Sequence, residues 1–525
     1  SAPHATYKLG GLLDNYVYGI RRFPYSTNNS VNPLTWADVD DTTNNLAGGI
    51  AADPLGFNGG GGMEVHNVGE IWALTLWEVR SRIIAANAGS VPTGNQTTLQ
   101  IVTDGMKLTP TEPTFTQARD ALITADCNTN GCANEQSIWD GFADRGLGYG
   151  SSDSSAYALG FTAGHLGIKE SFSAPYLDVQ TVTVDDSLGN NNGAADPNEP
   201  VRIIVNLKNP WRRAAKGVAS ATATLTSSTP GVVITDGSST YPAIPALGNA
   251  NGDTFAITVP TAATCGQSLK FTITSTSSLG VKAVPFSIRV GTPSGTAAPV
   301  TYTRSALGLA IPDNTARGIG DSLTITDDYE IADINFRVDS LTHTFINDLA
   351  VMMKAPNGYG NDYVTLIGLS NIDGGSGNNL VNFVVDDGAA APNDMIAASN
   401  ALATVAGDWR PAFNSPSWPA IYGPSADGTP QLGRLNGTST EGVWNIRASD
   451  NFQGDTGTLQ GWSLIVTPVA FACTPYVAPT TTTVSGSPNP SASGQNVTVT
   501  ATVTTTGPVP VTRSEEHTSE LQSPC

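Results

Sequence analysis

The sequence predicts a multidomain protein in which a mainly α-helical region is followed by all-β sandwich modules. The chain has 525 residues, enough for about three or four domains of ordinary size. Helical spacing of apolar residues is found within residues 1–160, and from about residue 176 it changes to the period of two that is typical of strands. The 55 glycines and 34 prolines favour turn-rich β-structure over long helices.

The N-terminal region contains three segments with the apolar spacing of amphipathic helices. The first starts at Gly69 and ends before Gly89. The second starts with a capping box formed by Thr114 and Gln117, and the third ends near Gly146. We therefore expect this region to be a helical lobe.

The rest of the chain is organised in β-rich blocks. Residues 178–184 and 201–207 alternate apolar and polar side chains, as the strands of an antiparallel sandwich do. Residues 497–503 alternate in the same way after a linker rich in Pro and Thr. The boundaries that we expect are 1–160 for the helical lobe, 161–175 for a linker, 176–293 for an Ig-like sandwich, 298–468 for a second β module, 474–483 for a second linker, 484–512 for a truncated Ig-like repeat and 513–525 for a tail.

Charge and hydropathy exclude two classes of function. Charged residues make up 13% of the chain, the net charge is −20 and the pI is near 4.5. A nucleic-acid-binding protein needs a basic stripe, which this composition does not provide. No apolar run approaches ~18 residues, so we predict no membrane span.

The cysteines indicate an exported protein. Cys127 and Cys132 flank an Asn-Gly pair, and this spacing predicts a small disulfide. A zinc knuckle is the alternative, but it needs further ligands nearby, and none is present. Whether Cys265 pairs with Cys473 is left open by the sequence.

The two ends of the sequence look unnatural. Residues 513–523 differ abruptly from the Thr-, Val- and Pro-rich sequence before them and resemble a translated sequencing adapter. We therefore give His517 and Cys525 no functional weight. Ser1 is neither a Met nor the beginning of a leader, so we expect the chain to be a piece of a longer protein.

Four collinear stretches of the N-terminal region form a specific combination. They are Gly19–Thr27 with Asn32–Thr35, Glu64–Ala73 with Leu76–Trp77, Asp104–Pro110 with Ala118–Ala121 and Ala125–Asp126, and Ile138–Gly148. With these stretches, residues 1–160 resemble the C-terminal part of the fungalysins, metallopeptidases of the thermolysin-like clan. The resemblance implies a secreted endopeptidase that hydrolyses extracellular proteins.

The family's chemistry requires zinc. Two histidines of a His-Glu-x-x-His motif and a downstream Glu bind the metal, and the Glu of the motif activates water. No His-Glu pair exists in this chain, because its histidines are followed by Ala, Asn, Leu, Thr and Thr: His4, His66, His165, His343 and His517. We expect the zinc ligands to precede Ser1, and the chain as it stands to be inactive.

The resemblance assigns the substrate-facing half of the site to this chain. His66 is the catalytic donor to the oxyanion, because a donor there stabilises charge that develops in the transition state. Arg21 binds the substrate carbonyl beside the scissile bond, and Ile20 lines the adjoining apolar pocket. Thermolysin-like sites orient the His with an Asp five residues before it. That position is Gly61 here, so Glu64 is the candidate for this role.

Other roles remain open for the same residues. The two arginines of the Gly-Ile-Arg-Arg segment could pair with surface carboxylates such as Asp38 or Asp40. His66 could begin a helix, and Glu70 could be a first-turn carboxylate that the helix dipole favours. His66 and Glu70 could also ligate a metal, because they are one helical turn apart.

A polar loop after the first predicted strand resembles a calcium site. Its spacing is not that of an EF-hand, because Leu188 would occupy the first ligand position. An irregular oxygen site and a solvated polar turn both remain open. The carboxylates concerned are Asp185, Asp186, Asp196 and Glu199.

A second resemblance covers residues 300–468. The stretches that carry it are His343–Leu349, Ala355–Gly358, Gly442–Ile446 and Asp455–Leu464. They resemble the P domain (Homo B) of kexins, a jelly-roll sandwich that stabilises a catalytic domain and often holds calcium. The carboxylates that we select as calcium ligands are Asp348, Asp386, Asp387, Asp450 and Asp455.

Asn436–Ser439 mimics the nucleophile motif of subtilases. A nucleophilic Ser needs a His base and an orienting carboxylate. The histidine nearest in sequence, His343, belongs to the P-domain motif, so we interpret Ser439 as a turn residue.

The sequence therefore predicts a fragment of a secreted zinc metalloendopeptidase with protein or peptide substrates. Two alternatives remain. One is a non-catalytic scaffold whose β modules contact a cell surface or a polysaccharide. The other is a fragment of a P-domain-bearing serine endopeptidase.

Overall fold

The structure is mostly β-sheet. The computed structural model describes residues 6–9, 20–39, 65–110, 113–152, 169–356, 363–367, 379–389, 404–409, 432–450 and 452–505. In these ranges strands are the main element, and all α-helices lie between residues 65 and 143. The prediction of a fold led by a mainly α-helical lobe is therefore wrong, because the helical part is short.

The segment before the helices explains this difference. Pro24 and Pro33 interrupt helical hydrogen bonding, and residues 29–31 form a turn. The described part of this segment contains one short 3-10 helix, Trp36–Val39, which is buried. The N-terminal segment is thus irregular chain that packs on helices instead of forming them.

The helical unit, residues 65–152, contains four α-helices in its described residues. They are α1 (Val65–Ala86), α2 (Val91–Leu108), α3 (Phe115–Asn130) and α4 (Glu135–Ala143). α1 begins before the predicted start at Gly69, and α2 was not predicted at all. The buried face of α2 is formed largely by small residues such as Gly94, Thr98 and Gly105, which give no apolar period. A Cβ on Gly94 would lie 2.4 Å from Ile84 Cγ1, so α1 and α2 pack closely there.

The capping box at the start of α3 is confirmed. The Thr114 hydroxyl accepts a hydrogen bond from the N–H of Gln117, and the Gln117 side-chain oxygen accepts one from the N–H of Thr114. Gly131 ends the helix with φ of 61°, a left-handed conformation that glycine adopts at little cost. Both ends of α3 are therefore specified locally by the sequence.

The front β unit, residues 178–289, consists of two sheets that enclose one apolar core. Its strands are β1 (Asp178–Asp185), β2 (Pro200–Lys208), β3 (Ala221–Ser227), β4 (Val233–Asp236), β5 (Ser238–Tyr241), β6 (Asn249–Asn251), β7 (Phe255–Thr258), β8 (Ser268–Ser277) and β9 (Gly280–Arg289). The order is β1-β2-β7-β4 in one sheet, with β6 also on β2, and β5-β3-β8-β9 in the other. The alternation predicted for residues 201–207 is confirmed, because every second side chain of β2 is buried.

The rear β unit, residues 292–472, repeats this arrangement with longer strands. Its strands are β10 (Thr292–Thr296), β11 (Val300–Arg304), β12 (Leu309–Ile311), β13 (Thr315–Ile325), β14 (Ile331–His343), β15 (Leu349–Lys354), β16 (Tyr363–Ile367), β17 (Asn379–Val385), β18 (Val405–Trp409), β19 (Gly442–Asp450) and β20 (Gly457–Ala472). One sheet has the order β10-β20-β14-β17-β18, with β11 and β12 also on β20, and the other has β13-β19-β15-β16. Phe336, Trp444 and Trp462 are buried in the shared core.

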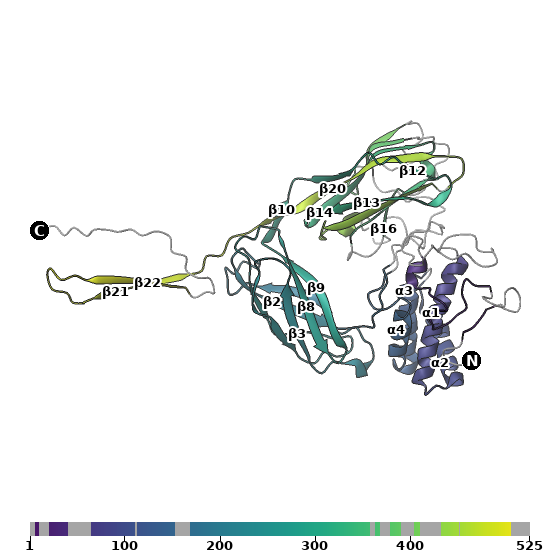
Figure 1. Cartoon of the computed structure of the whole chain (residues 1–525), viewed down its shortest axis with the longest axis horizontal. Helices are drawn as coiled ribbons and strands as arrows, with labels where there is room; N and C mark the ends of the chain where they lie inside the picture. The colour runs from purple at the N-terminus through teal and green to yellow at the C-terminus, as the bar shows by residue number, and fades with distance from the viewer. Residues whose placement is uncertain are drawn as a thin grey trace.

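The C-terminal strands β21 (Thr480–Ser487) and β22 (Thr498–Thr505) form a two-stranded ribbon that projects from the body (Figure 1). Its side chains are exposed, including Val484 at 67% and Val499 at 66%. The alternation predicted for residues 497–503 is present. An isolated hairpin is marginally stable in water, so the ribbon gains little from this pairing alone.

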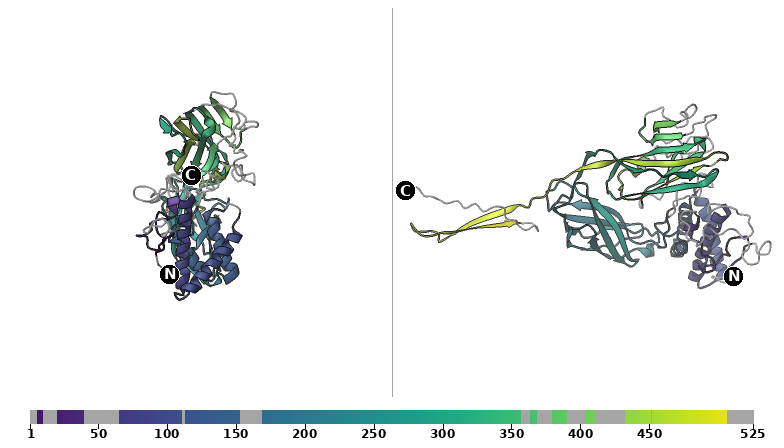
Figure 2. Two further views of the ribbon diagram at one scale, coloured as in Figure 1. Left: turned by 90° about the vertical axis from the view of Figure 1, so that its right-hand side faces the viewer. Right: turned by 45° about the horizontal axis from the view of Figure 1, so that its top comes forward.

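The helical unit lies at one end of the molecule, against the front β unit (Figures 1 and 2). Trp211, in the loop after β2, is 2% exposed because it packs into the apolar core of the helical unit. Its indole N–H donates to the carbonyl of Pro175 at 2.9 Å. Among the described helices, none has the length and hydropathy of a membrane span.

Candidate functional site

A buried ion pair fixes the N-terminal segment along α1. Arg145, which follows α4, is fully buried and donates to Oε1 of Glu78 at 2.7 and 2.9 Å. Burial raises the pKa of Glu78, and the charge of Arg145 opposes this shift. The guanidinium also donates to three carbonyl oxygens of the segment, those of Ser26, Asn32 and Leu34. The charge is thus both paired and hydrogen-bonded, as burial requires.

A second buried ion pair lies nearer the start of α1. Arg22, 3% exposed, donates from Nε to Oε2 of Glu70 at 2.9 Å and from Nη2 to the carbonyl of Asn67 at 3.0 Å. The other oxygen of Glu70 accepts the N–H of Phe23 at 2.9 Å. Residues 22 and 23 are therefore held against the first turns of α1.

This clamp brings together two of the predicted site residues. Arg21 donates from Nη1 to the backbone carbonyl of His66 at 3.3 Å, and the His66 side chain is exposed in the first turn of α1. Ile20 is half-buried beside them, and its N–H donates to the carbonyl of Leu9 at 2.8 Å. Burial raises the pKa of Tyr25, and the positive charge of Arg21 partly offsets this. Arg21 thus contacts the first turn of α1 at His66, and Ile20 precedes Arg21 in the chain.

The hydrogen bonds of Asp38, Arg22 and Glu70 bear on the other roles that the sequence left open for these residues. Asp38 accepts the N–H of Thr35 at 2.7 Å within its own turn, and Arg22 pairs with Glu70 instead. Both carboxylate oxygens of Glu70 accept hydrogen bonds from the N-terminal segment, so Glu70 has a structural role in the described part of the chain. Asp40, Gly61 and Glu64 lie outside the described residues.

Sequence reasoning missed Glu78 and Arg145. They are 67 positions apart, and although Arg145 lies in one of the stretches that carry the resemblance, nothing in that stretch indicates its partner. The only sequence signal is that a Glu lies within an apolar helical run, where an unpaired carboxylate would be unfavourable. The partner of such a Glu cannot be identified without the fold.

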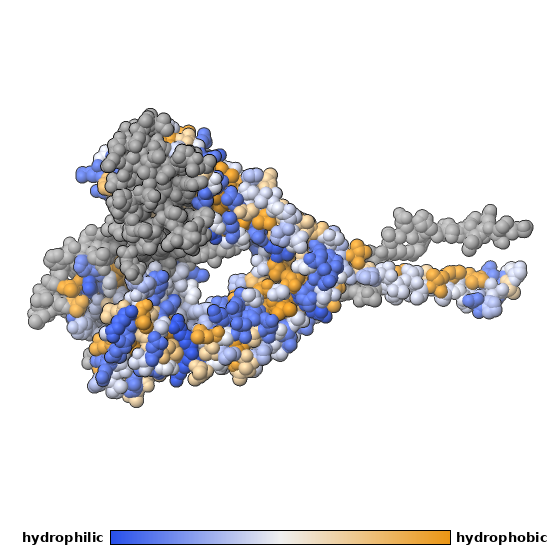
Figure 3. Space-filling view, turned by 180° about the vertical axis from the view of Figure 1, so that it is seen from behind, coloured by the Kyte–Doolittle hydropathy of each residue, from blue (hydrophilic) through white to orange (hydrophobic). Residues whose placement is uncertain are grey.

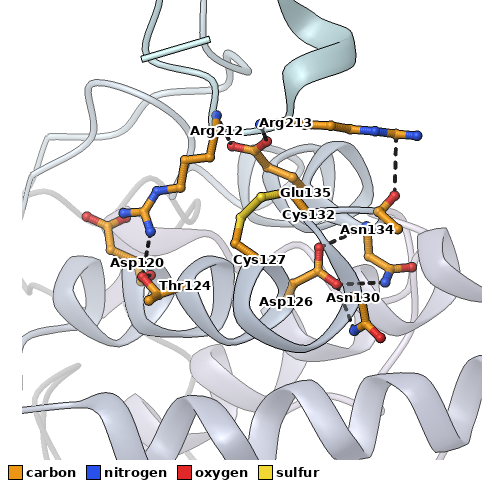
Figure 4. The surroundings of a disulfide bond; sticks show 11 residues. Asp120, Thr124, Asp126, Cys127, Asn130, Cys132, Asn134, Glu135, Arg212 and Arg213 are labelled. Atoms are coloured by element: carbon orange, nitrogen blue, oxygen red, sulfur yellow. Dashed lines mark hydrogen bonds between the residues drawn. A yellow bond between two sulfur atoms is a disulfide. The ribbon is translucent and has the colours of Figure 1, made fainter.

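The structure joins Cys127 to Cys132 at the turn between α3 and α4 (Figure 4). Beside this disulfide, Asp126 is fully buried and accepts hydrogen bonds from the side chains of Asn130 and Asn134 and from the N–H of Asn134. The turn is thereby fixed both covalently and by hydrogen bonds. It contains no arrangement of nucleophile and base.

This fixed turn presents Glu135 to the front β unit (Figure 4). Oε1 accepts the N–H of Arg212 at 2.9 Å, and Oε2 accepts the N–H of Arg213 at 2.7 Å. The Arg212 guanidinium also donates to Thr124 at 2.6 Å. The contact docks the two units, and Glu135 is a residue that sequence reasoning did not identify.

The polar loop between β1 and β2 uses its carboxylates as hydrogen-bond acceptors. Asp196, fully buried, accepts from the side chains of Asn190 and Asn192 at 2.7 and 2.6 Å. Glu199, also buried, accepts the N–H groups of Asn190 and Asp196 at 2.6 and 2.9 Å. Burial raises the pKa of Glu199, and the negative charges of Asp196 and Asp186 add to the shift. The side chain of Asp185 instead lies near Arg202, at 3.7 Å.

Three of the carboxylates predicted to bind calcium lie together in the rear β unit. Burial raises the pKa of Asp348 to about 6, and the charges of Asp450, Asp455 and Asp313 contribute to this. Asp450 also lies 3.2 Å from Nε2 of His343. This is the most acidic environment among the residues that we selected from the sequence.

The remaining two candidates are held by backbone groups. Asp386 and Asp387 follow β17 and accept the N–H groups of Gly388 and Gly433 at 2.7 and 2.8 Å. Within the described ranges, no three His, Cys, Asp or Glu side chains converge as the ligands of a metal ion do. Calcium binding by the β units therefore stays a prediction.

Ser439 has the partner of a structural residue. Its hydroxyl donates to Oδ1 of Asp328 at 2.5 Å, while the ring of His343 contacts Asp450 and the carbonyl of Phe345. The pKa of Asp328 is lowered by Ser439 and by neighbouring cations, although burial raises it. A carboxylate of low pKa is a poor base for a Ser proton.

The N-terminal region matches a known peptidase family. Residues 1–151 match the profile of the fungalysin metallopeptidases. Over 155 residues the chain is 38% identical to probable extracellular metalloproteinase 1 of Arthroderma benhamiae and to extracellular metalloproteinase 1 of Trichophyton rubrum. Each alignment covers 27% of this chain and 21% of the relative, so the chain spans about a fifth of the relatives' length.

The solved structure of the Aeromonas sobria serine protease aligns over 38% of this chain and 36% of that chain. The identity is 14% and the TM-score is 0.20, which is too low to support a conclusion about the fold.

The predicted relation of the N-terminal region to fungalysins is confirmed, and so is the extracellular location, because the relatives are extracellular enzymes.

The zinc ion that this family implies does not fit the residues present. The sequence contains no His-Glu pair, and in the described part of the chain no cluster of metal-ligating side chains exists. His66 is the described histidine of the matched region, and Glu70 beside it is engaged by Arg22. We therefore derive no catalytic step through a metal.

Proposed function

We propose that residues 1–151 form the substrate-facing part of a secreted zinc metalloendopeptidase of fungalysin type, and that the zinc ligands lie outside residues 1–525. The observation that carries the proposal is the position of Arg21 beside the first turn of α1, which bears His66. Both residues belong to the region that matches the family. The substrates are proteins or peptides.

The chemistry of the two side chains suits this role. Arg21 donates one N–H to the carbonyl of His66, and the remaining N–H groups of its planar fork can donate to a substrate carbonyl. The exposed imidazole of His66 can donate a hydrogen bond to an oxyanion that forms nearby. Ile20 supplies apolar surface next to them. All three depend on the Arg22–Glu70 pair for their placement.

The chain by itself is proposed to be inactive, because it holds neither the metal ligands nor the general base. The expressed chain, residues 1–525, should not hydrolyse casein when zinc is added. Hydrolysis that a chelator abolishes would contradict this proposal.

A fusion protein tests the assigned roles directly. The part of the Trichophyton rubrum enzyme that precedes the matched region is joined to residues 1–525 of this chain. The fusion should hydrolyse casein, and His66→Ala and Arg21→Ala should each lower kcat by roughly 100-fold, as for loss of an oxyanion donor. His343→Ala in the rear β unit is the control and should leave kcat unchanged. Activity that His66→Ala does not reduce would remove the assignment.

The scaffold alternative gives a different result in the same experiment. A fusion that folds and binds zinc but does not hydrolyse casein, while the β units bind an insoluble polysaccharide, would favour the non-catalytic function. The same experiment therefore distinguishes the two proposals, which are binding of the β units to a surface or polysaccharide and hydrolysis of proteins by the peptidase.

A further inference from the structure

The two β units are joined without a flexible linker. Only Val290 and Gly291 separate β9 of the front unit from β10, which pairs with the end of β20. Gly291 has φ of 83°, and a Cβ there would lie 2.4 Å from the carbonyl oxygen of Ala472. Its N–H donates to the carbonyl of Ala195 at 2.8 Å. The connection is therefore packed between the two units.

A disulfide crosses the same junction. Cys265 lies in the turn before β8 of the front unit, and Cys473 follows β20 of the rear unit. The two residues are 208 positions apart, so this bond closes β8, β9 and the whole rear unit into one covalent loop. The exit of the rear unit is thereby attached to the front unit.

The polar loop between β1 and β2 holds the chain immediately after this disulfide. Asp196 accepts the N–H of Thr474 at 3.0 Å, and the side chain of Asn190 donates to the carbonyl of Thr474 at 3.4 Å. The N–H of Tyr476 donates to the carbonyl of Pro197 at 2.9 Å. The loop that resembles a calcium site in sequence thus also binds a segment of this chain that follows the rear unit.

Ion pairs connect the two units on the other side of a cleft. Arg289 of β9 donates to Asp328 at 2.7 Å, and Lys270 of β8 pairs with Glu441. Between these ion pairs and the disulfide lies a cavity of about 750 Å³, which Cys265, Lys270, Asp328 and Glu441 help to line. Seen from behind, the units meet at one end, and open space separates the upper and lower parts farther along (Figure 3).

We propose that the Cys265–Cys473 disulfide and the polar loop form an interdomain lock, which makes the two β units one rigid arm with the cleft held open. The ion pairs are the secondary contact. They are partly exposed and screened by salt, whereas the disulfide and the buried loop are not. This inference goes beyond the proposed peptidase function and does not rest on it.

The lock is tested by removing the disulfide from the full chain. Three proteins are compared, all with Cys525→Ser so that no unpaired thiol remains: the parent, Cys265→Ser/Cys473→Ser, and the control Cys127→Ser/Cys132→Ser. Small-angle X-ray scattering gives the radius of gyration at low salt and at about 1 M sodium chloride, where the Debye length is about 3 Å. Hydrogen exchange reports on the N–H groups of Thr474 and Tyr476.

The parent and the control should keep the same radius of gyration at both salt concentrations. Cys265→Ser/Cys473→Ser should expand at high salt, and exchange at Thr474 and Tyr476 should rise by at least ~10-fold. Adding both Lys270→Ala and Arg289→Ala to this variant removes the two ion pairs and should produce the expansion already at low salt. Circular dichroism like that of the parent shows that both units still fold in this variant.

Two results would overturn the inference. One is a Cys265→Ser/Cys473→Ser variant with circular dichroism like the parent, whose scattering and exchange also match the parent at both salt concentrations. The other is a parent protein that expands at high salt while its disulfide is intact, because the arm would then not be rigid.

Discussion

The helical unit and the front β unit both bury carboxylates, but they compensate the charges differently. Glu70 and Glu78 of α1 each meet an arginine within 2.9 Å. Asp196 and Glu199 of the polar loop are fully buried and meet only N–H groups. An arginine supplies a full positive charge, whereas N–H groups supply dipoles.

This difference matches what each region holds in place. Arg22 and Arg145 bind the irregular N-terminal segment from within the core. Removing one of them leaves the carboxylate of Glu70 or Glu78 buried without its positive charge. The polar loop accepts hydrogen bonds from two backbone N–H groups of the chain that follows β20, at the edge of the front β unit. If these bonds are lost, water can reach the hydrogen-bonding groups. We therefore expect a larger effect on stability in the helical unit.

Arg145→Ala should have the largest effect. It leaves Glu78 buried without its partner and removes donors from three carbonyl oxygens, so the free energy of unfolding of the helical unit should fall by about 3–5 kcal/mol. Urea unfolding followed by helix circular dichroism measures this. Arg82→Ala is the control, because its partner Asp144 is partly exposed, and it should cost less than ~1 kcal/mol. Equal effects would contradict the distinction.

Asp196→Ala should have a smaller effect, in the front β unit. It removes the acceptor for Asn190, Asn192 and the N–H of Thr474, which should lower stability by about 2–3 kcal/mol. This loss of stability is measured by urea unfolding, with hydrogen exchange of the N–H groups of β2 as the signal. Asp185→Ala is the control at the end of β1, where the carboxylate is partly exposed and lies 3.7 Å from Arg202, and it should lower stability much less than Asp196→Ala does. A large effect of Asp185→Ala would show that the loop is stabilised in another way.

Features that depend on residues close together in the sequence could be predicted, whereas features that depend on residues far apart in the sequence could not. The capping box of Thr114 and the alternation in β2 were predicted, because local spacing specifies them. Helix α2 was missed because Gly94 and Gly105 occupy its buried face, where close packing takes the place of an apolar stripe. The mainly α-helical lobe was wrong because helical spacing in three segments was extended to the whole of residues 1–160, whereas the described α-helices lie between residues 65 and 143.

The candidate site shows the same limit. Arg21, Ile20 and His66 were selected by resemblance, and the structure places Arg21 within hydrogen-bond distance of the His66 carbonyl, while their catalytic roles stay a prediction. The pairing of Arg22 with Glu70 was not found, since the two are 48 positions apart and charge alone favoured Asp38 equally. The sequence left two roles open for the polar loop, because carboxylates that accept N–H groups and carboxylates that bind calcium have the same composition, and calcium binding stays a prediction.

The rear β unit extends the comparison to a buried carboxylate that lies near other carboxylates. Asp348 has a pKa of about 6, raised by burial and then by Asp450, Asp455 and Asp313, against an ordinary value of 3.8. The folded state therefore binds the proton more tightly than the unfolded state. The stability that this proton contributes is present below pH 3.8 and is lost as the pH rises through 6.

Asp348→Asn should remove this part of the pH dependence. Between pH 4 and pH 7 the parent should lose about 2 kcal/mol more than the variant, measured by urea unfolding at each pH. Asp236→Asn, at an exposed strand end of the front unit, is the control and should leave the pH profile of the parent unchanged. If Asp348→Asn kept the pH profile of the parent, the titrating group would instead be one of the neighbouring carboxylates, Asp313, Asp450 or Asp455.

Lys270→Ala should have the smallest effect, and it tests whether exposure or charge decides the ranking. The side chains of Lys270 and Glu441 are 44% and 42% exposed, so water already solvates both charges, and the loss should be at most ~0.5 kcal/mol. Arg289→Ala makes the comparison within the same cleft. Arg289 and Asp328 are 16% and 20% exposed, and Arg289 also donates to two backbone carbonyls, so it should cost roughly 1–2 kcal/mol. If both variants gave the same loss by urea unfolding, burial would not be what separates the strong ion pairs of this molecule from the weak ones.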